Sequence, residues 1–238
     1  LTFVPAEAGQ KVKVDVTSLK LFNTSSTGLN DVFRFYNGRE VDDGALMAEL
    51  LTDTKIVKST ADDGSLTVYF KSVAGTPKEG WEASVSQFTP GPMTLAGVEA
   101  EDTEITSAYA GEKDVILLLF NVKTDDQLNS LSVSGVSLCA ADVSDAGALS
   151  AVKIYSLGEK PNYATVMPSM VCGEATWSGT SMSVPLEKSL VEGNNWFAVA
   201  VDIAENALVG QVAGAKLSGV TIGGQTTVPT GDLSATVA

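Results

Sequence analysis

The stretch 62–88 constrains the fold more than any other part of the sequence. It reads as a turn, a strand, a loop and a second strand in unbroken succession. Apolar and polar residues alternate over 66–70, which is the period of a strand with one buried face. After a loop at 71–79, the alternation resumes in GWEASVSQF, with Trp81 at the start of the apolar face. We expect these two strands to pair antiparallel.

The same alternation recurs along the chain, and no segment sustains an apolar period of 3.6 residues. Most of the 22 glycines fall in the turns between the alternating segments. Segment 45–51 fits either a helical turn or a loop with a strand fragment. Further strands are expected at 1–4, 11–21, 31–36, 56–60, 93–100, 115–124, 128–139, 148–158, 176–186, 194–204 and 215–224. The predicted fold class is therefore all-β, made of antiparallel, jelly-roll-like β-sandwiches.

A boundary is expected where the alternation stops, at Thr89-Pro90-Gly91-Pro92. Two prolines and a glycine cannot continue a hydrogen-bonded strand ladder. The chain of 238 residues is long enough for two modest cores. We therefore predict two tandem sandwich domains, 1–90 and 93–238.

The charge balance argues against nucleic acid and anionic lipid as partners. The chain has 15 Lys and Arg against 29 Asp and Glu, a net charge of −14 at pH 7. The longest apolar run, 115–120, has the length of a strand, so no membrane span is expected. Leu1 lies inside an expected strand, which suggests that a signal peptide was removed or never included. The strand that ends at Ala238 suggests that further domains of the same polypeptide follow.

Histidine is absent from the sequence. This removes the usual general base, the usual zinc ligand and the serine triad, so no cofactor is expected and catalysis is disfavoured. Cys139 and Cys172 lie in unrelated contexts whose spacing matches no zinc site. A disulfide between them and two free thiols both stay open.

The first ninety residues resemble a CUB-type domain, an extracellular β-sandwich module. The resemblance rests on three blocks that occur in order, 31–38 (DVFRFYNG), 64–70 (GSLTVYF) and 80–83 (GWEA), and it covers most of residues 11–88. The cysteines usual in that family are missing.

Calcium-binding members of that family hold the ion with carboxylates, one of which matches Asp31. The position of a second carboxylate is Val73 here, so such a site would lack an oxygen donor. The resemblance therefore implies no metal site, and Asp31 is expected to cap a turn.

The second part resembles the sandwich domain found ahead of BNR-repeat sialidases and other surface glycan-handling proteins of gut Bacteroidetes. The resemblance rests on 190–197 (LVEGNNWF), on the strand that follows to Ile203, and on 152–156 (VKIYS) upstream. It covers roughly residues 95–225. The catalytic propeller of that family is absent, which implies an accessory module rather than the hydrolase.

Three residues are candidate ligand contacts, namely Trp196, Asp202 and Trp81. In the expected strand 194–204, Phe197 starts the core face, while Trp196 and Asp202 fall on the opposite face. A tryptophan beside two alanines fits a sugar-stacking platform, but a second packed face gives the same pattern and is the expected reading. Trp81, at the start of its strand, fits either a ligand contact or a core residue.

Pairs of acids fit turn chemistry better than glycoside hydrolysis. Each pair lies between apolar strands, where an Asp side chain bonds nearby backbone amides. Surface calcium is the alternative for these pairs. Residues 23–25 also form a formal glycosylation acceptor, Asn-Thr-Ser. The acidic pairs are Asp42-Asp43, Asp62-Asp63, Glu101-Asp102 and Asp125-Asp126.

These observations and resemblances together predict a non-catalytic, secreted or cell-surface accessory module. Its expected role is to bind carbohydrate or to position a larger glycan-handling protein. The alternative is a structural or adhesive module that binds a surface protein. Exposed aromatic side chains on a concave face would favour a glycan, and a flat apolar patch would favour a protein partner.

Overall fold

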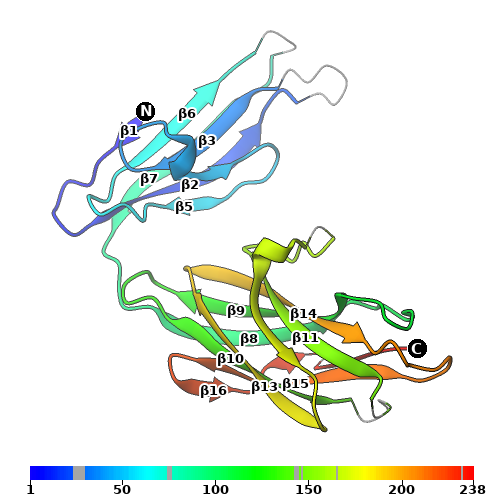
Figure 1. Cartoon of the computed structure of the whole chain (residues 1–238). Coiled ribbons are helices and arrows are strands. Elements are labelled where there is room, and N and C mark those ends of the chain that lie inside the picture. Colours follow the sequence, from blue (N-terminus) through cyan, green and yellow to red (C-terminus); the bar gives the residue numbers. More distant parts are fainter. Residues whose placement is uncertain (24–29, 74–76, 142–144, 146, 165, 232) are drawn as a thin grey trace. The chain divides into compact units, whose positions relative to one another are not determined.

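The computed structural model describes residues 1–23, 30–73, 77–141, 145, 147–164, 166–231 and 233–238 (Figure 1). The chain is all-β, as predicted. Residues Leu1–Gly91 form one compact unit, and Pro92–Ala238 form a second. Residues 24 and 25 of the glycosylation acceptor lie outside the described residues. No helix in the described ranges is long and apolar enough to span a membrane.

The first unit is a sandwich of two antiparallel sheets. The four-stranded sheet has the order β1 (Thr2–Phe3), β6 (Leu66–Lys71), β3 (Val32–Asn37) and β4 (Leu46–Glu49). The three-stranded sheet has the order β5 (Ile56–Lys58), β2 (Lys11–Lys20) and β7 (Gly80–Phe88). A short 3-10 helix, η1 (Asp43–Ala45), precedes β4, so 45–51 is mainly a strand fragment with a loop.

The core of the first unit lies between these two sheets. In β2 the valines 12, 14 and 16 are buried and alternate with half-buried Lys and Asp, which confirms the predicted strand. Fully buried Phe33 and Phe35 of β3 face them, with ring centroids 5.0 Å apart in an edge-on arrangement. Aromatic rings therefore fill the centre of this core.

The predicted pairing of the strands in 62–88 is wrong. β6 pairs with β3 and β1, whereas β7 pairs with β2 in the other sheet. Both strands occur close to where they were expected, at Leu66–Lys71 and Gly80–Phe88. The segment that joins them crosses from one sheet to the other, because alternation defines a buried face but does not define a partner.

The second unit is a larger sandwich. Its six-stranded sheet has the order β12 (Val171–Thr176), β11 (Leu149–Gly158), β14 (Gly193–Ile203), β9 (Val115–Asp125), β8 (Thr94–Asp102) and β17 (Thr230–Gly231). The other sheet has the order β13 (Ser181–Ser189), β10 (Ser132–Ala140), β15 (Ala213–Ile222) and β16 (Gln225–Thr227), and β18 (Ser234–Val237) also pairs with β15. β17 pairs with β8 in parallel, and the other pairings are antiparallel.

The six-stranded sheet is buried on both faces at its centre. One face packs on the other sheet, where the rings of Phe120 and Phe197 stack 4.9 Å apart. The opposite face carries a second, smaller apolar cluster that includes Ile116, Leu119 and Ala198. Burial on both faces explains why 115–120 reads as a continuous apolar run instead of alternating.

Among the strands of six or more residues in this unit, the sequence did not indicate one. β12 was not expected as a strand, because VCGEAT has a glycine at its centre and weak alternation. Trp177 follows the end of β12 and packs against the main core, and its backbone N–H donates to the Ser150 carbonyl at 3.0 Å. It is thus a packing residue between the two sheets. The connection between β11 and β12 contains a second 3-10 helix, η2 (Pro168–Met170).

Candidate functional site

Trp81 belongs to an aromatic group at the edge of the first sandwich. Its ring stacks on fully buried Phe33, with centroids 4.7 Å apart and planes inclined by 25°. Phe70 of β6 meets the Trp81 ring edge-on at 6.3 Å, and its side chain remains 41% exposed. Phe70 was expected on the buried face with Leu66. The strand position is right, but the ring lies near the end of β6 and is reachable from solvent.

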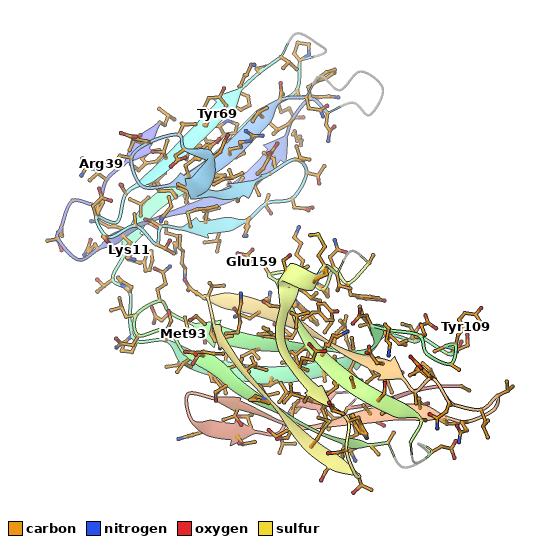
Figure 2. All side chains as sticks on the ribbon, in the orientation of Figure 1. Lys11, Arg39, Tyr69, Met93, Tyr109 and Glu159 are labelled. Carbon is orange, nitrogen blue, oxygen red and sulfur yellow. The ribbon has the colours of Figure 1, made fainter. Side chains whose placement is uncertain are left out.

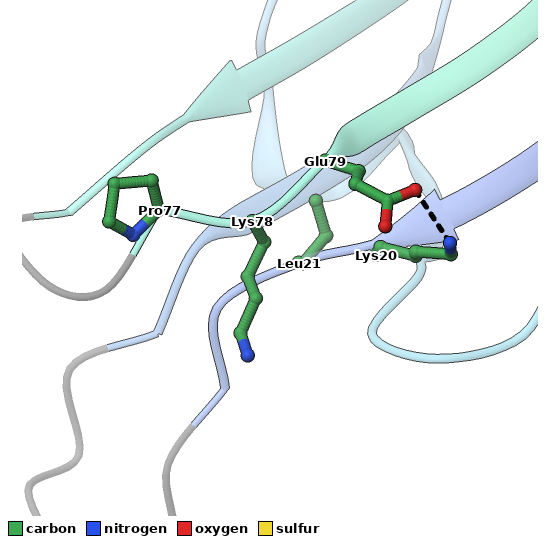
Figure 3. A pocket seen from close by; sticks show the side chains of 5 residues that line it. All are labelled: Lys20, Leu21, Pro77, Lys78 and Glu79. Atoms are coloured by element: carbon green, nitrogen blue, oxygen red, sulfur yellow. Dashed lines mark hydrogen bonds and ion pairs between the residues drawn. The ribbon is translucent and has the colours of Figure 1, made fainter.

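A shallow hollow of about 510 Å³ lies where the end of β2 meets the residues that precede β7. Lys20, Leu21, Pro77, Lys78 and Glu79 line it (Figure 3). Strand pairing brings its two walls together, because the end of β2 pairs with the start of β7. The hollow thus combines apolar side chains with three charged groups next to the start of β7, where Trp81 lies.

The charged groups of the hollow are not equivalent. Lys20 and Glu79 form an ion pair with a 2.6 Å separation, and both side chains are largely exposed. An exposed pair of this kind contributes little to stability, so its partners are available to a ligand. Lys78 makes no ion pair within the described residues, and in Figure 3 its side chain extends away from Glu79. The hollow therefore offers one lysine, Lys78, that forms no ion pair among the described residues.

Trp196 lies on the outer face of the six-stranded sheet, as predicted, but that face is covered. Its half-buried ring belongs to the small apolar cluster that also contains buried Ala198, Ala200 and Tyr155. The connection between β11 and β12 contributes three side chains to this cluster, those of Tyr163, Val166 and Met170. The arrangement matches the packing alternative stated for Trp196 from the sequence.

Asp202 belongs to an ion-pair network at one end of the same face. The Asp114 carboxylate accepts hydrogen bonds from Lys153 Nζ and Tyr155 Oη, each at 2.7 Å. Asp202 Oδ1 accepts the Asp114 backbone N–H at 3.0 Å, and its carboxylate lies 3.5 Å from both Lys153 Nζ and Lys113 Nζ. Asp202 is buried, with 8% of its surface exposed. This network cross-links β14, β11 and the residue that precedes β9.

Three groups of the network, Asp114, Lys153 and Tyr155, have shifted pKa values. Burial alone would raise the pKa of Asp114, but hydrogen bonds from Lys153 and Tyr155 outweigh it and lower that pKa. The hydrogen bond to Asp114 raises the pKa of Lys153. Burial, together with the Asp114 carboxylate, raises the pKa of Tyr155 to about 12. None of these three groups is poised to exchange a proton at pH 7, which is the property a general acid or base needs.

The acidic pairs behave as the turn chemistry predicts at three positions. Asp42 Oδ1 accepts the Gly44 N–H at 3.0 Å, and Asp102 Oδ1 accepts the Glu104 N–H at 3.0 Å. Asp63 accepts both the N–H and the hydroxyl of Ser65 and pairs with Arg39 at 2.6 Å. In the described residues, no group of three or more Cys, Asp or Glu side chains is arranged to hold a metal ion.

Asp31 has a larger structural role than the predicted turn cap. Its carboxylate is 6% exposed and accepts the N–H of Val73 at 2.9 Å and of Phe22 at 2.8 Å. These two backbone hydrogen bonds lower the pKa of Asp31. Asp31 therefore joins three chain segments, and the sequence signal for this was only an acid directly before a strand.

Cys139 and Cys172 are free thiols, on β10 and β12. Cys172 Sγ lies 3.3 Å from the Ile154 carbonyl oxygen. Burial raises the pKa of the Cys172 thiol to about 11, so the thiol stays protonated and weakly nucleophilic at neutral pH.

Comparison with known proteins identifies no family for the chain. Neither the protein-family scan nor the search of curated proteins finds a match. Among solved structures, the Hadza microbial sialidase Hz136 is similar at 14% identity and a TM-score of 0.47, over 58% of this chain and 30% of the sialidase. The N-terminal CBM22-1-CBM22-2 tandem domain of Paenibacillus barcinonensis Xyn10C is similar at 11% identity and a TM-score of 0.29, over 93% of this chain and 80% of that structure. Both scores lie below 0.5, so neither likeness assigns a family or an activity.

Proposed function

We propose that this chain is a non-catalytic accessory module of a secreted or surface-displayed protein, and that it binds carbohydrate through its first unit. The carrying observation is the exposed Phe70 ring against Trp81, which lies two positions after Glu79 of the hollow that Lys20 and Lys78 also line. Ligand sites combine a concave apolar surface with a few polar groups, and this edge provides both. The CUB-like and sialidase-associated resemblances remain predictions that agree with this role.

The absence of catalysis is part of the proposal. The sequence contains no histidine, and Asp114, Lys153 and Tyr155 each keep one protonation state at neutral pH. Asp202 is committed to the same network through its contacts with Lys153 and Asp114. The role of the module is then to hold a larger protein near its glycan.

The first test measures retention of the full chain on a glycan panel. Phe70→Ala should weaken binding about tenfold or more, which corresponds to about 1.4 kcal/mol. Tyr109→Ala is the matched control, because Tyr109 is an 82% exposed aromatic of the second unit (Figure 2). Equal losses in both variants, or unchanged binding by Phe70→Ala, would contradict the proposed site.

A second test addresses the charge of the glycan. Lys78 is a cation without an ion-pair partner in the described part of the chain, so it favours a carboxylated or sulfated sugar. Lys78→Gln should reduce retention of acidic glycans and leave that of neutral glycans unchanged. Lys123→Gln is the control, since Lys123 is paired with Glu99 at 2.7 Å in the second unit.

A further inference from the structure

We propose that two copies of this chain associate through β7, pairing antiparallel across a two-fold axis at Ser84 to join two three-stranded sheets into one. β7 is the outer strand of its sheet and is nine residues long. This interaction goes beyond carbohydrate binding, and its surface adjoins the proposed carbohydrate site because Trp81 belongs to β7.

β7 is unusual among the edge strands because it lacks protection. Proteins guard exposed edges with short strands, prolines and charged residues. The other nine-residue edge, β13, contains Pro185, Glu187 and Lys188 and packs beside β12. The remaining edge strands have two to six residues. β7 has no proline and no lysine, and Glu82 is its single charge.

The main-chain groups of β7 that face outward can be identified. Val12 and Val16 of β2 direct their backbone N–H groups away from β7, since Val12 N–H donates to the Gly64 carbonyl at 2.9 Å and Val16 N–H to that of Lys55 at 3.1 Å. Their opposite residues on β7, Gln87 and Ala83, are therefore in non-hydrogen-bonded pairs with β2. By alternation, residues 81, 83, 85 and 87 point their N–H and C=O groups away from the sheet. Strand pairing supplies no partner for these groups within the described chain.

The side chains along this edge leave apolar surface open. Val85 is 46% exposed although it lies opposite buried Val14. Ala83 and Trp81 are half-buried on the same face, and Phe70 is exposed next to Trp81. A strand added beside β7 would cover part of this strip.

A second copy fits the edge in both length and pairing. With Ser84 on the axis, all nine residues pair, and Ala83 lies opposite Val85 of the second copy. Pairs of outward-pointing residues exchange two hydrogen bonds each, which gives roughly eight across the junction. The half-exposed Val85 side chains then pack against Ala83 of the other copy, on the inner face of both sheets.

The charges around β7 are also complementary to a second copy. Glu82 would lie opposite Ser86 of the other copy, and Ser86 is paired with Lys13 on the neighbouring strand. Lys13 lies directly opposite Lys58 in the sheet, and like charges in that position repel. Lys13 makes no ion pair among the described residues. The Glu82 carboxylate of the second copy would supply the missing negative charge.

Sedimentation of the full chain over a concentration series tests this association. A junction of one strand from each copy is small and therefore weak, so we expect a reversible dimer to appear between about 10 µM and 1 mM. Val85→Lys should weaken it at least about tenfold, and Leu208→Lys, at a 71% exposed position in the second unit, should not. A chain that is monomeric up to about 1 mM, or a dimer that both variants weaken equally, would overturn the proposal. Thermal melts confirm that both variants are folded.

Cysteine cross-linking tests the register. Ser84→Cys places two thiols in one non-hydrogen-bonded pair, where Cα atoms lie about 4.5 Å apart, so a covalent dimer should form on mild oxidation. Ser86→Cys is the matched control, because residue 86 lies on the same exposed face but faces position 82 of the other copy. Cross-linking by Ser86→Cys to the same extent as by Ser84→Cys would overturn the proposed pairing.

Exchanging the charges at positions 82 and 13 tests the proposed attraction between Glu82 of one copy and Lys13 of the other. Glu82→Lys should weaken the dimer several-fold, and adding Lys13→Glu to it should restore association. Within one copy these residues are not paired, since Glu82 lies opposite Ser18 and Lys13 opposite Ser86. Failure of the double variant to recover would contradict the contact between copies.

Discussion

The two units differ in charge, in the side chains of their cores and in how their sheets are covered. Residues 1–91 carry nine Lys and Arg against twelve Asp and Glu, whereas residues 92–238 carry six against seventeen. The first core centres on the rings of Phe33, Phe35 and Trp81. The second core is mainly aliphatic, and its six-stranded sheet is covered on both faces. The first unit leaves the edge strand β7 open, while the six-stranded sheet of the second unit is covered on both faces at its centre.

This difference shows that a tryptophan on a strand face does not define a site. Trp81 and Trp196 are both half-buried, and each adjoins small residues on its strand. The ring of Trp196 lies in a cluster supplied by the connection between β11 and β12. Trp81 lies under an exposed Phe70 at an open edge. Whether another segment covers the strand face, and not the residue type, decides whether a tryptophan packs in a core or is available to a ligand.

The largest effect is expected from Phe33→Ala, which tests whether the first core stands apart from the second. Phe33 is fully buried and contacts three other rings. Its removal should destabilise the first unit by about 3–5 kcal/mol and leave the melting of the second unit unchanged. Calorimetry of the full chain measures both transitions. Phe120→Ala, in the second core, should show the opposite pattern, and a shared loss in either variant would contradict separate cores.

A smaller effect is expected from Trp196→Ala. Because the ring is half-buried in the second apolar cluster, its loss should cost about 2–3 kcal/mol of stability in the second unit. Glycan retention should be unchanged. Measuring the melting temperature and retention together separates packing from stacking. Lost retention at an unchanged melting temperature would show that Trp196 is the platform.

The acid dependence of the first unit should depend partly on Asp31. Its folded-state pKa is lowered by two backbone N–H groups, so its contribution is present above pH 4 and is lost as the pH falls through that lowered value. Asp31→Asn should cost about 1–3 kcal/mol at pH 7 and progressively less in acid. Urea unfolding at pH 7 and pH 3 measures this. The control Asp114→Asn should lower the stability of the second unit instead. A stability cost of Asp31→Asn that is the same at pH 7 and pH 3 would be inconsistent with the proposed linkage.

The smallest effect is expected from calcium. Both oxygens of the Asp31 carboxylate already accept backbone N–H groups, and Val73 brings no carboxylate to this place. Millimolar calcium should therefore leave the melting of the first unit unchanged relative to chelator. A shift of several degrees would indicate a bound ion, because saturating ligand adds a few kcal/mol.

Strand positions could be predicted from sequence more fully than strand partners. Alternation located β2 and β3, since each buries one face against a core, and it located β7, whose half-buried Trp81 and Ala83 pack against the same core. It could not show that β6 and β7 belong to different sheets, because that depends on the path of the connection between them. It also did not indicate β12, whose central Gly173 packs closely against Leu186 and Pro185 and presents no side chain to alternate.

The candidate site was only partly predictable, for a similar reason. Trp81 was singled out by its type and position, but alternation placed Phe70 on the buried face and indicated neither its exposure nor its contact with Trp81 from the other sheet. The network of Asp114, Lys153 and Asp202 joins residues up to 88 positions apart, and the pairing of β14 with both β11 and β9 brings them together. Such contacts leave no local sequence pattern.

The most direct test is to observe the indole N–H signals of Trp81, Trp177 and Trp196 by NMR while a retained glycan is added to the full chain. Substituting each tryptophan in turn assigns the three signals. We predict that the Trp81 signal moves with glycan concentration and that the Trp177 and Trp196 signals stay in place. A shift of the Trp196 signal with an unmoved Trp81 signal would place the glycan on the second unit and contradict the proposed site.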